Sequence, residues 1–169
     1  MSEAALRVHE LYKRYKEVVA VNGLDMEVTR GECFGLLGPN GAGKTTTIEI
    51  CEGLTKHDSG DVTVLGMHWE SDAHVLRQRL GIQLQETNFS EKLTVLETVR
   101  LFRSFYRKGP QPAETLSLVQ LDEKKNARVG ALSGGQKQRL ALACVLGAAS
   151  VVPWKRLRQR DSLVVNASA

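Results

Sequence analysis

The chain lacks any apolar run long enough to cross a membrane. Its longest stretch without a charged residue extends from Leu140 to Trp154, which is shorter than the ~20 residues that a spanning helix requires. Three charged residues, Glu3, Arg7 and Glu10, stand near the N-terminus. Because a secretory signal needs an uninterrupted apolar segment there, we expect no such signal.

Cysteine is scarce, and the cysteines lack the spacing of metal-binding or redox-active pairs. The three cysteines, Cys33, Cys51 and Cys144, form no C-x-x-C pair, and one would be left over from any disulfide. This pattern favours reduced thiols in a cytosolic protein.

The excess of positive charge belongs to the C-terminal residues. The net charge is +4, and residues 151–169 contribute +3 of it because four basic residues face only Asp161. A polybasic tail can bind nucleic acid or anionic lipid, but a solvated terminus explains the same charge. We therefore expect no nucleic-acid partner, and we predict one domain over residues 1–150 followed by a basic tail of doubtful origin.

Apolar periodicity predicts a strand-rich first half and a helical second half. Residues 6–11 and 24–28 alternate apolar with polar and indicate half-buried strands. Residues 32–37 are more continuously apolar and indicate a strand covered on both faces. Three further elements are expected in the middle of the chain: a short helix ended by Gly53, a short strand within 57–66, and a helix capped by Ser71 and Asp72. Two helices are expected after them. The first covers 94–109 and begins with a Thr94–Glu97 capping box, and the second covers 112–121.

The sequence GPNGAGKT at 38–45 fits the phosphate-loop pattern G-x4-G-K-[ST] between an expected strand and an expected helix. Gly38, Gly41 and Gly43 allow the backbone to fold into a nest of N–H groups at a helix N-terminus, where phosphate is favoured. Lys44 adds a cation near the outer phosphates, and the Thr45 hydroxyl is a ligand for Mg2+.

A glycine-rich turn with an incidental lysine is the structural alternative. A phosphate loop also leaves the reaction open, since GTPases, kinases, motors and transporter ATPases all carry one. No N-K-x-D guanine signature follows the loop, which disfavours a GTPase.

A second group of glycines stands at the start of an apolar helix, in LSGGQ at 132–136. Ser133 and Gln136 have the spacing of a capping box, which alone would start a helix. Gly134 and Gly135 each cost up to ~1 kcal/mol relative to alanine in a helix. They make sense if another surface approaches this backbone closely and Ser133 and the free N–H groups face an anion.

The two motifs together, with LSGGQKQRLALA following the phosphate loop, resemble those of the ATP-binding-cassette (ABC) transporter ATPases over about residues 4–149. The resemblance implies an α/β P-loop NTPase fold with a mixed sheet and a helical subdomain at about 87–132, incomplete at the C-terminus. It implies ATP and Mg2+ as cofactors, and a head-to-tail dimer with a second nucleotide-binding domain. It also implies a transmembrane permease subunit as partner and a cytoplasmic location at the inner face of the cell membrane.

The resemblance assigns a role to individual residues. Tyr15 corresponds to the aromatic residue that stacks on adenine, although it could be an ordinary strand tyrosine. Gln85 corresponds to the glutamine that contacts Mg2+ and the attacking water, although it could be a loop glutamine. The other expected ATP-binding residues are Gly38, Pro39, Asn40, Gly41, Ala42, Gly43, Lys44, Thr45, Thr46, Ser133, Gly134, Gly135 and Gln136. The segments at 44–54 and 84–102 resemble bacterial exporters of drugs, antibiotics or polysaccharides.

The catalytic acid of the family has no counterpart here. In these ATPases an apolar strand ending in Asp-Glu follows the signature helix, and a histidine comes later. Asp161 is the only acidic residue after Glu123, it follows KRLRQR, and all histidines precede the signature. Without a positioned base, turnover falls by 10²–10⁴-fold or more, so ATP hydrolysis by this chain is left open.

Two hypotheses address the ending at 151–169. It is a foreign sequence from a frameshift, a truncated reading frame or a vector, or its segment SLVV at 162–165 supplies a substitute strand. Three functions then compete: the ATPase subunit of a transporter, a non-hydrolysing nucleotide-binding module, and a fragment that does not fold alone.

Overall fold

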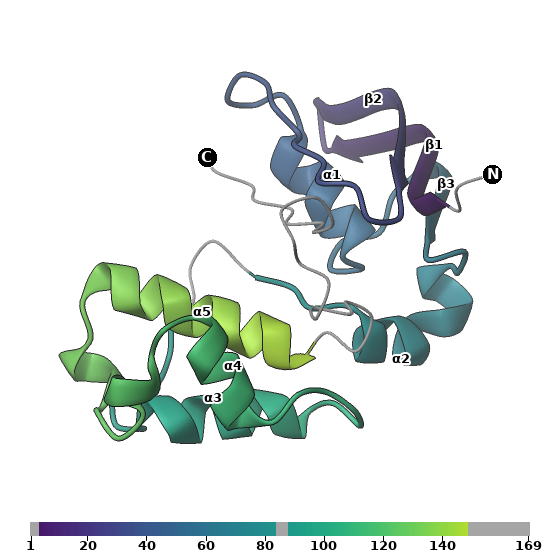
Figure 1. Ribbon diagram of the computed structural model, residues 1–169. Helices are drawn as coiled ribbons and strands as arrows, with labels where there is room; N and C mark the ends of the chain where they lie inside the picture. The colour runs from purple at the N-terminus through teal and green to yellow at the C-terminus, as the bar shows by residue number, and fades with distance from the viewer. Residues whose placement is uncertain (1–3, 84–87, 149–169) are drawn as a thin grey trace. The chain divides into compact units, whose positions relative to one another are not determined.

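The computed structural model describes residues 4–83 and 88–148. The described chain divides into two compact units, one ending at Leu76 and one beginning at Arg77. The first unit contains the three strands and α1, and the second contains α3, α4 and α5 (Figure 1). In the part of the chain that is described, no helix combines the length and the apolarity needed to cross a bilayer.

The first unit contains a three-stranded antiparallel sheet. Strands β1 (Ala4–Tyr15), β2 (Val18–Thr29) and β3 (Ser59–Val64) lie in the order β2-β1-β3. Alternate apolar side chains bury one face of this sheet, which confirms the strands expected at 6–11, 24–28 and within 57–66. The buried apolar residues of the three strands are Ala5, Leu6, Val8, Leu11, Val21, Val28, Val62 and Val64.

Helix α1 (Lys44–Cys51) follows the glycine-rich loop and ends where the sequence predicts. Its last turn passes into Gly53, which has a φ of 72°. The ring of Trp69 lies so close that a Cβ on Gly53 would be 2.4 Å from it. The Trp69 indole also donates a hydrogen bond of 2.9 Å to the Cys51 carbonyl, which satisfies one of the free carbonyls at the end of the helix.

Helix α2 (Trp69–Arg79) begins earlier than expected. Ser71 and Asp72 were expected to cap it, but they lie inside the helix, and Asp72 has a non-helical conformation (φ −117°, ψ 16°). A turn that starts at Trp69 therefore continues into the expected helix across a kink. The polar side chains mark the kink rather than the start, because Ser71 donates to the Asp72 carboxylate instead of capping a free N–H group.

The expected strand at 32–37 does not form. Residues 33–40 have no regular structure, Cys33 is exposed and Leu37 is 91% exposed. A strand buried on both faces needs hydrogen-bonded neighbours and covering layers. Within the described residues no strand pairs with this segment, so the sheet that forms is wholly antiparallel. The α/β class is confirmed, whereas the parallel strand before the loop is a wrong prediction.

The second unit is helical. It consists of α3 (Val95–Ser104), α4 (Pro112–Leu118), two 3-10 turns η1 (Asp122–Lys124) and η2 (Val129–Ala131), and α5 (Gly134–Ala148). Helices α3, α4 and α5 lie together (Figure 1), and their buried side chains contribute to one apolar cluster. Its buried members are Val95, Val99, Leu116, Val119, Leu121, Val129, Leu132, Leu140, Ala143 and Cys144.

The capping box of α3 is confirmed in detail. The Thr94 hydroxyl accepts a bond from the Glu97 N–H, and the Glu97 carboxylate accepts one from the Thr94 N–H at 2.8 Å. The helix ends at Ser104, earlier than the predicted end at Gly109. The Arg103 guanidinium donates to the carbonyl oxygens of Tyr106, Gly109 and Pro110, which fixes the following chain in an irregular turn.

Candidate nucleotide site

The loop at 38–45 has the backbone of an anion cradle. Gly41 and Gly43 have φ values of 83° and 78°, in the left-handed region that favours glycine. A Cβ placed on Gly38 would lie 3.6 Å from the Ala42 Cβ and 3.8 Å from the Lys44 Cδ. Both distances are ordinary van der Waals contacts, so the requirement for glycine in this loop comes from the conformations of Gly41 and Gly43.

Gly43 is fixed by a second constraint, which comes from the sheet. A Cβ at this position would lie 2.0 Å from the Ala20 carbonyl oxygen on β2. No real side chain tolerates that distance, so only glycine lets the start of α1 approach the sheet. The sequence pattern indicated the loop but gave no sign of this contact.

Lys44 folds back over its own loop. Its ammonium group donates hydrogen bonds of 2.8 Å to both the Gly38 and the Pro39 carbonyl oxygens. Two of its three N–H donors are used in this way. The positive charge is thus held at the mouth of the cradle, where phosphate oxygens are better acceptors than neutral carbonyls.

The first turn of α1 is suited to an anion. No acidic residue lies in this turn, so the positive end of the helix dipole is not neutralised. Thr47 is buried and its hydroxyl bonds the Gly43 carbonyl, which secures the turn from inside. Thr45 is exposed and Thr46 half-buried, as a residue that reaches a bound ligand must be accessible.

The other loop residues expected at the site, Pro39, Asn40 and Ala42, are all exposed. A turn closed by the Ala42 N–H and the Pro39 carbonyl at 3.2 Å carries Asn40 at its tip.

Tyr15, the expected adenine contact, ends β1 in the same unit as the loop. Its side chain is 46% exposed, and the Lys13 ammonium lies 5.2 Å from the centroid of its ring. Lys13 is held there by an ion pair of 2.9 Å with Asp58. An exposed ring at a strand end can stack on a base, so the position fits the expected role without testing it.

The second group of expected site residues begins α5 in the helical unit. The Gln136 side chain accepts a bond of 2.9 Å from the Ser133 N–H, and the Ser133 hydroxyl accepts one of 3.3 Å from the Gln136 N–H. The motif therefore does form a capping box.

The capping box leaves the glycine pair unexplained. A Cβ on Gly134 or Gly135 would meet nothing within 4 Å, and neither residue has a positive φ. Within the described residues, neither a turn nor a close contact requires glycine at these positions. The open space is consistent with contact by a surface outside this unit.

Gln85 and the residues from 149 onward lie outside the described residues, and with them the two hypotheses on the ending. Asp161 also falls there. The described residues contain no group of three or more His, Cys, Asp or Glu side chains able to hold a metal ion.

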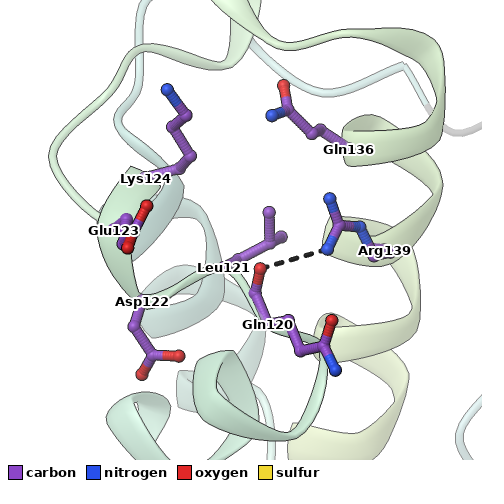
Figure 2. A pocket seen from close by; sticks show the side chains of 7 residues that line it. All are labelled: Gln120, Leu121, Asp122, Glu123, Lys124, Gln136 and Arg139. Atoms are coloured by element: carbon purple, nitrogen blue, oxygen red, sulfur yellow. Dashed lines mark hydrogen bonds between the residues drawn. The ribbon is translucent and has the colours of Figure 1, made fainter.

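The structure adds two features that the motifs did not indicate. Glu52, at the end of α1, is half-buried, and burial together with the nearby Glu49 raises its pKa to about 7. In the helical unit, Arg139 and Gln136 project from α5 toward the segment 120–124 and line a depression of about 290 Å³ (Figure 2). An arginine one turn after a motif gives no recognisable signal in the sequence.

The family model described as ABC transporter matches residues 21–152, which include both glycine motifs. The chain belongs to the ABC transporter family. It carries the ATP-binding domain of that family, and the predicted resemblance is confirmed.

Among curated relatives of this ABC domain are Nod factor export ATP-binding proteins I. The protein from Burkholderia orbicola (strain AU 1054) is 41% identical over 151 residues, covering 86% of this chain and 50% of the relative. The protein from Rhizobium meliloti (strain 1021) is 40% identical over 147 residues, covering 84% of this chain and 44% of the relative. The chain thus spans about half the length of the curated relatives it matches.

Solved ABC cassettes share the fold. The ATP binding subunit of an ABC transporter superposes with a TM-score of 0.74 at 26% identity, covering 84% of this chain and 62% of the other. A dimeric cassette in a post-hydrolysis state, bound to ADP and Pi, superposes with a TM-score of 0.71 at 28% identity, covering 85% and 69%. The ABC-ATPase fold class is therefore confirmed.

Proposed function

We propose that the chain is the ATP-binding part of an ABC exporter and that its ligand is MgATP. The loop at 38–45 supplies a backbone cradle, a lysine and an unneutralised helix N-terminus. The relatives carry the name Nod factor export ATP-binding protein I, which supports export as the direction of transport.

The phosphate loop binds the β- and γ-phosphates of ATP. On binding, the Lys44 ammonium exchanges its bonds to the Gly38 and Pro39 carbonyls for charge-assisted bonds to phosphate oxygens. N–H groups at 41–46 bind the same oxygens at the start of α1. Magnesium would neutralise part of the phosphate charge, and the Thr45 hydroxyl and Gln85 would be its protein ligands. The Tyr15 ring would stack on the adenine.

The observation that carries the proposal is the open space around Gly134 and Gly135. Two glycines in a first helical turn weaken the helix, and no described residue of their own unit requires them. A γ-phosphate bound to a second copy of the domain would use this space, with Ser133 and the two glycine N–H groups as donors. Two domains then pair head to tail and enclose two ATP molecules.

The partners and the location follow from the same proposal. A transmembrane permease subunit would receive the movement of the closing dimer, and the helical unit would contact it. The domain would lie at the cytoplasmic face of the membrane.

A non-hydrolysing ATP-binding module is the second candidate. It rests on one sequence observation, that Asp161 is the only acidic residue after Glu123 in the given sequence and follows KRLRQR rather than an apolar run. ATP would then hold the dimer closed without turnover. Steady-state release of phosphate by the purified chain separates the two candidates.

Binding of a fluorescent MgATP analogue tests the shared part of both candidates. Lys44→Ala should lower the affinity at least ~10-fold, because a hydrogen bond between charged groups contributes about 1.5–3 kcal/mol. Lys56→Ala, which removes an exposed lysine after the same helix, should leave the affinity unchanged. Equal affinity of wild type and Lys44→Ala would contradict the role of the loop. A melting curve by circular dichroism, with and without MgATP, shows whether the chain folds alone.

A further inference from the structure

The first turn of α5 has no packing of its own. Gly134 and Gly135 are exposed, a Cβ on either would meet nothing within 4 Å, and burial in the apolar cluster resumes only at Leu140. The side-chain ion pair of this turn joins Lys137 to Glu91 at 3.6 Å, with both side chains largely exposed. Glycine also leaves the backbone more conformational freedom than any other residue. Something other than apolar packing must therefore fix the direction in which the N–H groups of this turn point.

Arg139 makes a polar contact between this part of α5 and another helix. Its Nη1 donates bonds of 3.3 Å to the Val119 carbonyl and 3.1 Å to the Gln120 carbonyl. Val119 is the C-cap of α4, and Gln120 follows it with a φ of 55°. Carbonyls at a helix end lack partners within the helix and carry partial negative charge, so a guanidinium stabilises them.

Gln136 and Arg139 share one face of α5, since they are three residues apart. Figure 2 shows both side chains facing the segment that carries Gln120 and Leu121. Gln136 in turn accepts the bond from the Ser133 N–H that closes the capping box. The capping residue and the arginine thus line the same depression, and a rotation of the first turns of α5 would move both.

We propose that Arg139 is the positioning residue for the Ser133–Gly135 turn. By bonding to the end of α4, it fixes the rotation of α5 ahead of Leu140 and holds the glycine N–H groups in the orientation that a triphosphate on a second copy requires. It contacts no ligand itself. The reason for fixing the turn, which is to bind a triphosphate on a second copy, rests on the proposed function. The fixing of the turn by Arg139 occurs within a single chain and can be tested without a second copy.

Backbone nitrogen-15 relaxation of the whole chain tests the fixing directly. In Arg139→Ala the order parameters of Gly134 and Gly135 should fall from near ~0.85 to below ~0.6, while those of residues 140–144 stay unchanged. Arg139→Lys keeps the positive charge and an N–H donor, so its order parameters at Gly134 and Gly135 should lie between those of the wild type and Arg139→Ala. This variant replaces Arg139→Ala in the test if the alanine variant does not fold. Arg100→Ala, an exposed arginine on α3, is the matched control.

Two association measurements complete the test. Arg139→Ala should weaken ATP-driven self-association at least tenfold without changing the affinity of the monomer for the MgATP analogue, because the phosphate loop lies in the other unit. Unchanged order parameters at Gly134 and Gly135 in both Arg139 variants would overturn the inference, and so would a loss of rigidity along all of α5. If the wild type does not associate in ATP, the proposed function fails, and the relaxation data still decide whether Arg139 fixes the turn.

Discussion

The Ala20 carbonyl oxygen on β2 lies 2.0 Å from the point that a Cβ on Gly43 would occupy. The start of α1 is therefore in direct contact with the antiparallel sheet. Gly43 also has a φ of 78°, so both space and backbone conformation exclude other residues.

Gly43→Ala should destabilise the first unit by at least ~2 kcal/mol, because a left-handed conformation costs roughly 1–2 kcal/mol and the overlap adds to it. It should also lower affinity for the MgATP analogue. Urea unfolding and a binding titration measure the two effects. Gly66→Ala is the control, since Gly66 has a φ of 74° but open space around it. Equal losses in the two variants would show that the sheet contact is not decisive.

Replacing the signature glycines should change stability and association in opposite directions. Gly134→Ala or Gly135→Ala should stabilise α5 by a few tenths to ~1 kcal/mol, since the added Cβ meets nothing. The same Cβ would obstruct the partner's triphosphate and weaken ATP-driven association, as measured by analytical ultracentrifugation.

Gly147→Ala provides the matched control on the same helix. Its Cβ would lie 3.8 Å from Thr115 Cγ2, an ordinary contact. It should stabilise α5 and leave association unchanged. Normal association of the Gly134 and Gly135 variants would remove the case for a ligand at this turn.

Glu52 should make the first unit less stable as the pH rises. Its pKa is raised to about 7 from 4.5, first by burial and then by Glu49, so the folded chain holds the proton more tightly than the unfolded chain. The contribution is complete below about pH 4.5 and is lost as the pH rises through about 7.

Glu52→Gln removes this dependence. Its melting temperature should exceed that of the wild type clearly at pH 8 and less at pH 5, with exposed Glu17→Gln as the control. If the melting temperatures of Glu52→Gln and the wild type differ by the same amount at pH 5 and pH 8, Glu52 is not the source of the pH dependence.

Local signals in the sequence were sufficient for most of the fold. The Thr94 capping box, the period-two alternation of β1 and β2 and the glycine after α1 act over a few residues, so the structure reproduces them. The strand expected at 32–37 depended on neighbours far along the chain. Apolar composition indicates a preference for burial but does not provide the pairing strand.

In the candidate site, too, local features could be predicted from the sequence and long-range contacts could not. The loop at 38–45 was identified from its G-x4-G-K-[ST] spacing, whereas the glycines at 134–135 were singled out by their unfavourable place at a helix start and by the family resemblance. The contact of Gly43 with Ala20 and the bonds from Arg139 to the end of α4 join residues far apart in sequence. No local pattern encodes such contacts, and only the folded chain displays them.

The central claim is that one ATP is bound by Lys44 of one copy and by the Ser133–Gly135 turn of another. A nitrogen-15-labelled Lys44→Ala chain, unable to bind ATP in its own loop, is mixed with unlabelled wild type and an ATP analogue carrying a photoreactive group on its γ-phosphate. After irradiation and digestion, mass spectrometry locates the adduct. We predict an adduct on residues 133–136 of the nitrogen-15-labelled chain. Adducts confined to the wild-type chain would contradict the claim.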